Sequence, residues 1–182
     1  SAFNRDSFVA GVNRLLRKLP DHRPLSIEPL LEGRCSVLPV PLNDTQDRSE
    51  RQVAEGDARW HQGDLIALHQ APVKIVWASR WEYDKGPDRL LTLLQELEVR
   101  GRDYQICILG EQFRHSPNEF ELIKQRFAAQ IVQFGFVPSK DEYLQWLASA
   151  DIVLSTSVHE FQGVAVLEAI AAGCVPVLPK RM

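Results

Sequence analysis

The sequence predicts an α/β fold built on a Rossmann-like, doubly wound parallel sheet. From residue 73 onward, short apolar runs alternate with segments of helical pattern, and the runs are apolar on both faces. Strands that are buried on both faces belong to parallel sheets covered by helices on each side. Because ligands bind beyond the carboxyl ends of such strands, functional side chains are expected in the loops that follow them.

The first half of this region predicts two strands, each followed by a helix. They are the strands 73–79 and 104–110 and the helices 87–100 and 118–130. Pro87 lies in the first turn of its helix, where the missing amide hydrogen is not needed. Asn118 or Ser116 is expected to cap the second helix.

The second half continues the alternation. It predicts the strands 131–136, 151–157 and 175–179 and the helices 139–150 and 163–173. Ser139 with Glu142 forms a capping-box pattern at the start of the first of these helices. No internal repeat interrupts the series.

The first 70 residues predict a different organisation. Residues 4–19 carry Phe8 and four other apolar side chains at helical spacing, which indicates an amphipathic helix that the prolines after it end. The run 35–40 predicts a short strand, and the polar stretch 41–70 predicts a linker or mobile loop. We expect a boundary after residue 34, between a crossover helix with its linker and the Rossmann-like domain over 35–182.

The composition of the chain argues against several classes of function. The net charge of -3 and the pI of about 6.0 argue against a dedicated nucleic-acid module. Three scattered cysteines without a CxxC pair favour a reducing, cytoplasmic setting. No apolar run approaches the ~18 residues of a membrane span, and no DxD or HExxH pattern suggests a metal site. The GxSxG, GxGxxG and Walker A motifs are also absent.

The loop after the first strand, SRWEYDKG, holds Arg80 and Lys85 before a helix N-terminus. Two cations there suit a diphosphate, although a solvated basic loop has the same composition. After the second strand, Gly110 allows close approach of a ligand to the backbone, or it serves a simple turn. After the third, the extended backbone at Val137, before Pro138, faces the edge of a planar base or forms an ordinary loop.

The stretch HEFQGVAVLEA carries two carboxylates, Glu160 and Glu168. The first-turn amides near Gln162, Gly163 and Val164 are expected to point toward the ligand side. Glu168 interrupts an apolar helix, and a lone buried carboxylate is costly unless it is hydrogen-bonded. Two ribose hydroxyls would satisfy it, but so would a partly wet helix edge.

Taken together, these residues resemble the donor-binding half of retaining GT-B glycosyltransferases of family 4. The resemblance rests on the Arg80-x4-Lys85 loop, Gly110 with Glu111, GFVPSKDEY, and Glu160 with Glu168 in an E-x7-E arrangement. Along the whole chain, FNRDSF, LPDHRP, WASRWEYDKGPD and GCVPVLPK are further similar to the family of tRNA-queuosine alpha-mannosyltransferases.

The resemblance implies transfer of mannose, with retention, from GDP-mannose to queuosine in the anticodon of tRNA-Asp. It implies that Arg80, Lys85 and Glu160 are catalytic, the two cations neutralising the donor diphosphate and Glu160 contacting the sugar. The implied donor-binding residues are Gly110, Glu111, Val137, Phe161, Gln162, Gly163, Val164 and Glu168. Val137 would face guanine and Glu168 the ribose. Neither a metal nor another cofactor is implied.

A GT-B enzyme has two Rossmann-like halves, and the sequence matches the C-terminal one. The chain is therefore expected to be a truncated piece of a longer enzyme, and to be inactive by itself. Two other functions remain open. One is a family 4 glycosyltransferase with another nucleotide sugar and a glycan or small-molecule acceptor. The other is a non-catalytic module that binds nucleotide or tRNA.

Overall fold

The computed structural model describes residues 2–21, 27–42, 72–112 and 115–180. The chain forms two compact units, Ser1–Pro41 and Leu42–Met182. The predicted boundary after residue 34 falls inside the first unit. The predicted loop over 41–70 lies almost wholly outside the described residues, so its mobility stays a prediction.

The first unit contains two helices, α1 (Ala2–Leu16) and α2 (Ile27–Glu32). The first predicted helix is confirmed but ends at Leu16, and Phe8 and Leu15 of its predicted apolar face are exposed. The short helix α2 was not predicted. The strand predicted over 35–40 is wrong, because this segment has no regular structure. Pro39 lacks the amide hydrogen that a ladder needs, and no strand of the described chain pairs with the segment.

The second unit contains each strand and helix predicted between residues 73 and 179, all of them shorter at one or both ends. The strands are β1 (Val73–Ala78), β2 (Tyr104–Leu109), β3 (Ile131–Gly135), β4 (Ile152–Leu154) and β5 (Val175–Val177). The helices are α3 (Pro87–Val99), α4 (Glu119–Arg126), α5 (Lys140–Ser149) and α6 (Val164–Ala171). A short 3₁₀ helix that the sequence did not predict, η1 (Tyr83–Lys85), precedes α3.

The strands form one five-stranded sheet in the order β3-β2-β1-β4-β5, and all their pairings are parallel. The first strand is central, with Val76 beside Cys107 of β2 on one side and Val153 of β4 on the other. Because the strand order reverses between β1 and β4, the loops after these two strands flank the point where ligands bind in such sheets. The predicted α/β fold class is therefore confirmed.

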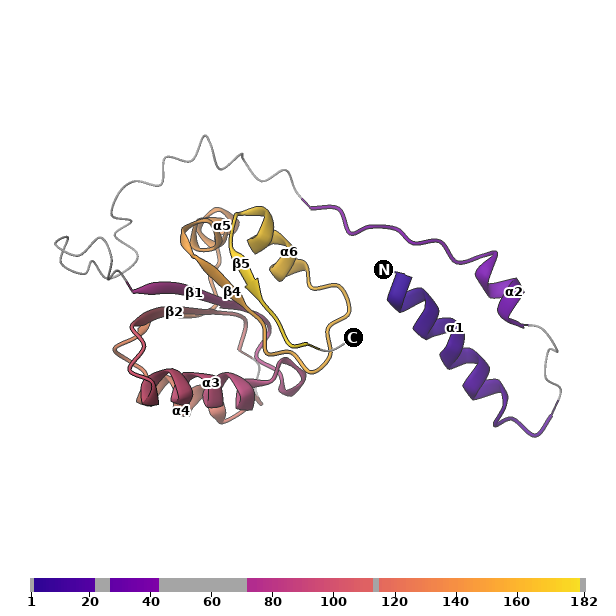
Figure 1. Cartoon of the computed structure of the whole chain (residues 1–182), viewed down its shortest axis with the longest axis horizontal. Helices are drawn as coiled ribbons and strands as arrows, with labels where there is room; N and C mark the ends of the chain where they lie inside the picture. Colours follow the sequence, from indigo (N-terminus) through magenta and orange to yellow (C-terminus); the bar gives the residue numbers. More distant parts are fainter. Residues whose placement is uncertain (1, 22–26, 43–71, 113–114, 181–182) are drawn as a thin grey trace. The chain divides into compact units, whose positions relative to one another are not determined.

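Helices cover both faces of the sheet. Figure 1 shows α3 and α4 on one side of the sheet and α5 and α6 on the other. One core cluster contains Trp77 of β1, Leu90 of α3 and Phe120 of α4, and a second contains Trp146 of α5 and Ala169 of α6. Both faces of the sheet are thus covered around its central strands, as the apolar pattern predicted, whereas β3 is half-buried and the edge strand β5 is exposed.

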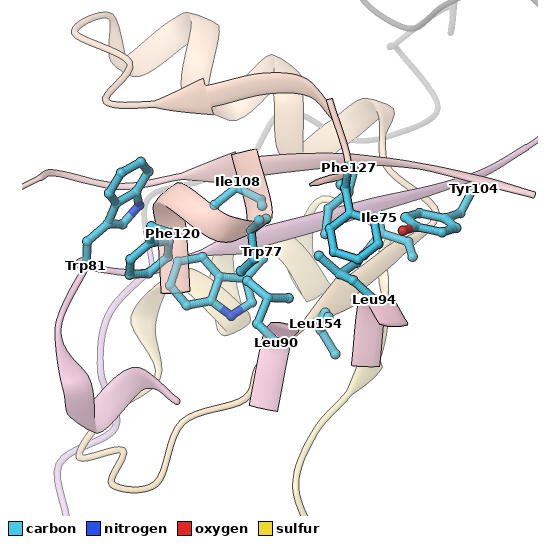
Figure 2. Close-up of a cluster of buried hydrophobic side chains, with 12 residues drawn as sticks. Ile75, Trp77, Trp81, Leu90, Leu94, Tyr104, Ile108, Phe120, Phe127 and Leu154 are labelled. Carbon is cyan, nitrogen blue, oxygen red and sulfur yellow. The ribbon is translucent and has the colours of Figure 1, made fainter. Parts of the chain in front are cut away.

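An aromatic stack anchors the loop that follows β1 to the first core. Trp81, which is 2% exposed, stacks on Phe120 with ring centroids 4.4 Å apart. Figure 2 shows both rings at the edge of the buried cluster that contains Trp77 and Leu90. The residue before Trp81 is Arg80, so the position of this cation is tied to the core.

Two predicted helix caps have different outcomes. The Ser139 hydroxyl accepts a hydrogen bond of 3.3 Å from the Glu142 amide, which confirms the cap of α5. Asn118 occupies the cap position of α4, but its side chain makes no capping bond. Its backbone already has helical angles (φ -62°, ψ -21°), whereas a capping side chain needs an extended backbone.

Candidate functional site

A cavity of about 440 Å³ lies at the carboxyl ends of β1, β2 and β3. Its size is that of a small-molecule or nucleotide pocket. The loops after these strands and the first turns of α5 and α6 supply its walls. The lining residues are Ala78, Ser79, Arg80, Leu109, Gly110, Glu111, Phe136, Val137, Pro138, Lys140, Tyr143 and Ala165.

Arg80 lines this cavity from the loop after β1. Its side chain is 60% exposed, and Nη1 lies 3.1 Å from Oε1 of Glu82. A guanidinium carries five N–H donors, so this ion pair uses only part of its capacity. The arrangement leaves Arg80 able to bind an anion in the cavity.

Gly110 and Glu111 hold the loop after β2 against the loop after β1. A Cβ atom at Gly110 would lie 1.9 Å from the carbonyl oxygen of Ser79 and 2.8 Å from the Trp81 ring. The Glu111 carbonyl accepts a hydrogen bond of 3.2 Å from the Trp81 amide. Only glycine permits this close packing at position 110, so this residue has a structural reason that is independent of any ligand.

Lys85 is buried, with 7% of its surface exposed. Its Nζ lies 3.2 Å from Oδ2 of Asp84 and 3.3 Å from Oε2 of Glu160, and it donates to the carbonyl oxygen of His159 at 3.3 Å. Two carboxylates and a carbonyl offset the cost of burying an ammonium group. The structure thus brings together Lys85 and Glu160, two residues that the sequence placed on the same side of the sheet.

A buried hydrogen-bond chain fixes the backbone at Lys85. The Thr156 hydroxyl donates to the Lys85 carbonyl at 2.7 Å and accepts from Nε1 of Trp77 at 2.9 Å. The amide of Val158 donates to the Asp84 carbonyl at 2.7 Å. These bonds connect η1 to the loop after β4 and to the core. The backbone of Lys85 is therefore fixed by both.

The Glu160 carboxylate lies in the loop just before α6 and accepts hydrogen bonds from backbone amides of that loop. Its Oε1 accepts hydrogen bonds from the amides of Gly163 at 3.1 Å and Phe161 at 3.2 Å, and its Oε2 accepts from the Ser157 hydroxyl at 3.4 Å. The Gly163 amide, which the sequence predicted to point toward a ligand, is hydrogen-bonded to this carboxylate. A carboxylate just before a helix satisfies these amides and interacts favourably with the helix dipole.

Glu168 has two partners on α5, so the expectation of a lone carboxylate is wrong. Its Oε1 lies 2.6 Å from Nζ of Lys140, and its Oε2 accepts a hydrogen bond of 2.9 Å from the Tyr143 hydroxyl. The Glu168 side chain is 15% exposed. Burial first, and then the Glu168 charge, raise the pKa of Tyr143 far above its ordinary value, so the phenol is a neutral donor.

The site residues predicted from the sequence fall into two groups. Arg80, Gly110, Glu111 and Val137 line the cavity directly. The others are not among its lining residues, although Ala165 of α6 is. Lys85 lies in η1, Glu160, Phe161, Gln162 and Gly163 lie in the loop before α6, and Val164 and Glu168 lie in α6.

Sequence reasoning missed four polar residues of the site. They are Lys140 and Tyr143, which hold Glu168, and Thr156 and Ser157, which contact the Lys85 and Glu160 loops. The spacing of Lys140 and Tyr143 could have indicated the first pair, because residues three apart share one helix face. No local pattern distinguishes Thr156 from an ordinary loop threonine.

Within the described parts of the chain, no three His, Cys, Asp or Glu side chains gather closely enough to hold a metal ion. No described helix has the length and apolar character needed to cross a membrane.

The sheet order and the cavity at the strand ends define a Rossmann-like α/β domain. The chain belongs to the family of group 1 glycosyl transferases, whose family model matches residues 66–181. A second family model, described as the N-terminal part of tRNA-queuosine alpha-mannosyltransferase, matches residues 1–42.

Curated relatives extend this result. The chain is similar to tRNA-queuosine alpha-mannosyltransferase of Drosophila melanogaster, with 35% identity over all 182 residues, which make up 46% of that protein. It is 30% identical over 107 residues to the GDP-mannose:cellobiosyl-diphosphopolyprenol alpha-mannosyltransferase of Xanthomonas campestris, covering 57% of this chain and 28% of that protein. The chain thus spans less than half the length of these relatives.

Solved structures support the fold. The pneumococcal O-GlcNAc transferase GtfA, whose crystal structure contains UDP and GlcNAc, matches 61% of this chain and 21% of its own with a TM-score of 0.51. The sequences are 23% identical over the matched part, so this likeness concerns the fold alone.

Proposed function

We propose that the protein containing these residues transfers mannose, with retention, from GDP-mannose to queuosine in the anticodon of tRNA-Asp. The observation that carries this proposal is the similarity to the Drosophila tRNA-queuosine alpha-mannosyltransferase, which runs the length of the chain. The family model that matches residues 1–42 is described by the same enzyme activity. The Xanthomonas relative supports the donor, because its name specifies GDP-mannose.

The cavity and the cations beside it suit a nucleotide-sugar donor. In the proposed complex, the diphosphate lies near Arg80 and Lys85, and the guanine lies against the backbone at Val137. Glu168 binds the ribose hydroxyls, and Glu160 contacts the mannose. Gly110, Glu111 and the segment from Phe161 to Val164 complete the donor site.

The proposed chemistry is electrostatic. As the bond between mannose and diphosphate breaks, negative charge grows on the leaving GDP. Fixed cations in a dry environment stabilise such charge better than mobile water does. Lys85 is 7% exposed and held by two carboxylates, which supports a preorganised role. The proposal assigns this neutralisation to Arg80 and Lys85 rather than to a metal ion.

The acceptor hydroxyl, on the cyclopentene-diol of queuosine, forms the new bond to the sugar as the bond to the diphosphate breaks, and its proton passes to the departing GDP. The proposed tRNA acceptor agrees with the cytoplasmic setting inferred from the cysteines. Residues 1–182 alone are expected to bind the donor weakly and to transfer no mannose.

A second candidate function has a specific observation in its favour. The Xanthomonas relative uses a lipid-linked sugar as its acceptor, according to its name. The same donor site could therefore serve a glycan or another small-molecule acceptor.

Mass spectrometry of tRNA nucleosides tests the proposal. The full-length protein is incubated with queuosine-containing tRNA-Asp and, in separate reactions, GDP-mannose, UDP-glucose and UDP-GlcNAc. We expect queuosine to gain one hexose with GDP-mannose only. A gain with a UDP-sugar would overturn the donor assignment, and tRNA binding with no transfer would favour a non-catalytic module. In that case binding would depend steeply on salt and survive Glu168→Ala.

A further inference from the structure

Both carboxylate oxygens of Glu168 contact residues to which the proposed function assigns no role. Lys140 contacts Oε1 at 2.6 Å, and the Tyr143 hydroxyl donates to Oε2 at 2.9 Å. Lys140 also lies over the Tyr143 ring, with Nζ 4.7 Å from the ring centroid. The three side chains form a compact group between α5 and α6.

Two of these three side chains form part of the cavity wall. Lys140 and Tyr143 both line it, together with Val137 on the segment that leads into α5. The Lys140 side chain is 51% exposed, whereas Tyr143 packs against the core cluster that contains Trp146. Tyr143 therefore provides a rigid support, and Lys140 provides a solvent-facing one.

The two contacts leave Glu168 able to bind a ligand. A carboxylate offers about four acceptor positions, two on each oxygen. Lys140 and Tyr143 act on different oxygens, so each oxygen retains capacity for one further donor. A cis-diol presents two hydroxyl donors with a spacing that matches the two oxygens of one carboxylate.

Holding the carboxylate in advance also favours binding. A ligand that must itself order a side chain loses part of its binding free energy to the entropy cost. Glu168 is already fixed by one charged and one neutral donor, so a diol meets a prepared acceptor. The Tyr143 hydroxyl suits this task because it stays protonated near neutral pH.

We propose that Tyr143 and Lys140 are positioning residues that hold Glu168 for a ribose diol, and that the site thereby selects ribonucleotides over 2′-deoxyribonucleotides. This inference rests on the proposed function, because it needs a nucleoside diphosphate in the cavity. It gives residues of α5 a role in recognising the ribose, in addition to the contact that Glu168 of α6 makes with it.

The test measures dissociation constants of GDP and 2′-deoxy-GDP for the full-length protein by calorimetry. Wild-type protein is expected to bind GDP about tenfold or more tightly than 2′-deoxy-GDP. This ratio corresponds to the free energy of one hydrogen bond to a charged group. In Tyr143→Phe and Lys140→Gln the affinity for GDP falls, while that for 2′-deoxy-GDP changes little. The preference therefore drops toward about one, and Lys140→Arg, which keeps a positively charged donor, is expected to retain more of it than Lys140→Gln does.

Two control variants remove a tyrosine hydroxyl and a lysine ammonium group at positions outside the site. Tyr104→Phe deletes a buried hydroxyl at the start of β2 that has no hydrogen-bond partner among the residues that the structure describes. Lys124→Gln removes an exposed ammonium from α4, on the opposite face of the sheet. Both are expected to keep the wild-type preference. Lys140→Gln changes a half-exposed side chain, so it tests the idea even if Tyr143→Phe folds poorly.

The possible results separate the two proposals. Variants that keep the wild-type preference, or that lose affinity for both nucleotides equally, would overturn the positioning role and leave the donor assignment intact. Binding of UDP in place of GDP would overturn the base assignment, and the preference is then measured with UDP and 2′-deoxy-UDP. Absence of nucleoside diphosphate binding in wild type would overturn both proposals.

Discussion

Gly86 joins the turn that carries Lys85 to the start of α3. Its backbone lies in the left-handed region, with φ of 65°, and a Cβ atom there would lie 2.2 Å from the carbonyl oxygen of Thr156. Glycine is needed at this position for its conformation and for its size. The position of the proposed phosphate-binding lysine thus depends on a residue with no side chain.

Gly86→Ala is predicted to destabilise the protein more than Gly101→Ala. Gly101 has a similar φ of 58° but no atom within 4 Å of an added Cβ, so its substitution costs only the left-handed conformation, ~1 kcal/mol. Gly86→Ala adds a clash and is expected to cost at least ~2 kcal/mol more. Urea unfolding of both variants measures the difference, and equal losses would contradict the packing argument.

Residues that follow a strand directly could be predicted as site residues, because chain position alone determines on which edge of a parallel sheet they lie. Arg80, Gly110 and Val137 are of this kind, and they do line the cavity. The partners of Glu168 could not be predicted in this way. They depend on how α5 packs against α6, and that packing is set by side chains far apart in the sequence.

At the scale of elements, β2 is the most completely buried strand, with all of its residues from Tyr104 to Leu109 buried. Burial, and then the Glu98 charge, raise the pKa of Tyr104 to about 12. Burial also raises the pKa of the Cys107 thiol. Both groups stay neutral in the folded protein at a pH where they ionise in the unfolded chain.

The stability of the protein is therefore predicted to fall at alkaline pH. A raised folded-state pKa means that the folded state holds more protons, so the contribution is complete below the unfolded pKa and is lost as pH rises. The loss begins near pH 9 for Cys107 and runs from about 10 to about 12 for Tyr104.

Each group contributes up to ~1.4 kcal/mol per pH unit. Tyr104→Phe and Cys107→Ala should each reduce the slope, as measured by denaturant unfolding at a series of pH values. Slopes identical to wild type would show that these groups ionise equally in both states.

Elements could be predicted where apolar periodicity and burial agree, as they do for the strands of the sheet. Elements whose formation depends on pairing with distant parts of the chain could not be predicted. The apolar run at 35–40 is strand-like in composition, yet an isolated segment with Pro39 finds no ladder to join. The helix α2 has only six residues and contains Pro29. Its sequence therefore shows no helical periodicity from which it could be predicted.

At the scale of the whole molecule, the order β3-β2-β1-β4-β5 brings the loops after β1 and β4 to adjacent positions. This adjacency places Lys85 against Glu160, although they lie 75 residues apart in the chain. The fold class and this edge of the sheet followed from the alternation of strands and helices and from the rule that ligands bind at the carboxyl ends of parallel strands. The proposed base, sugar and acceptor rest on similarity to relatives.

The central claim is that the strand-end cavity binds the nucleotide-sugar donor, and calorimetric titration of the full-length protein with GDP-mannose tests it most directly. We predict saturable binding of one donor per chain, weakened by at least about tenfold in Arg80→Ala and in Glu168→Ala, since each removes a charged hydrogen-bonding group. Lys124→Gln should bind as wild type does. Unchanged binding in both site variants would contradict the claim and place the donor elsewhere.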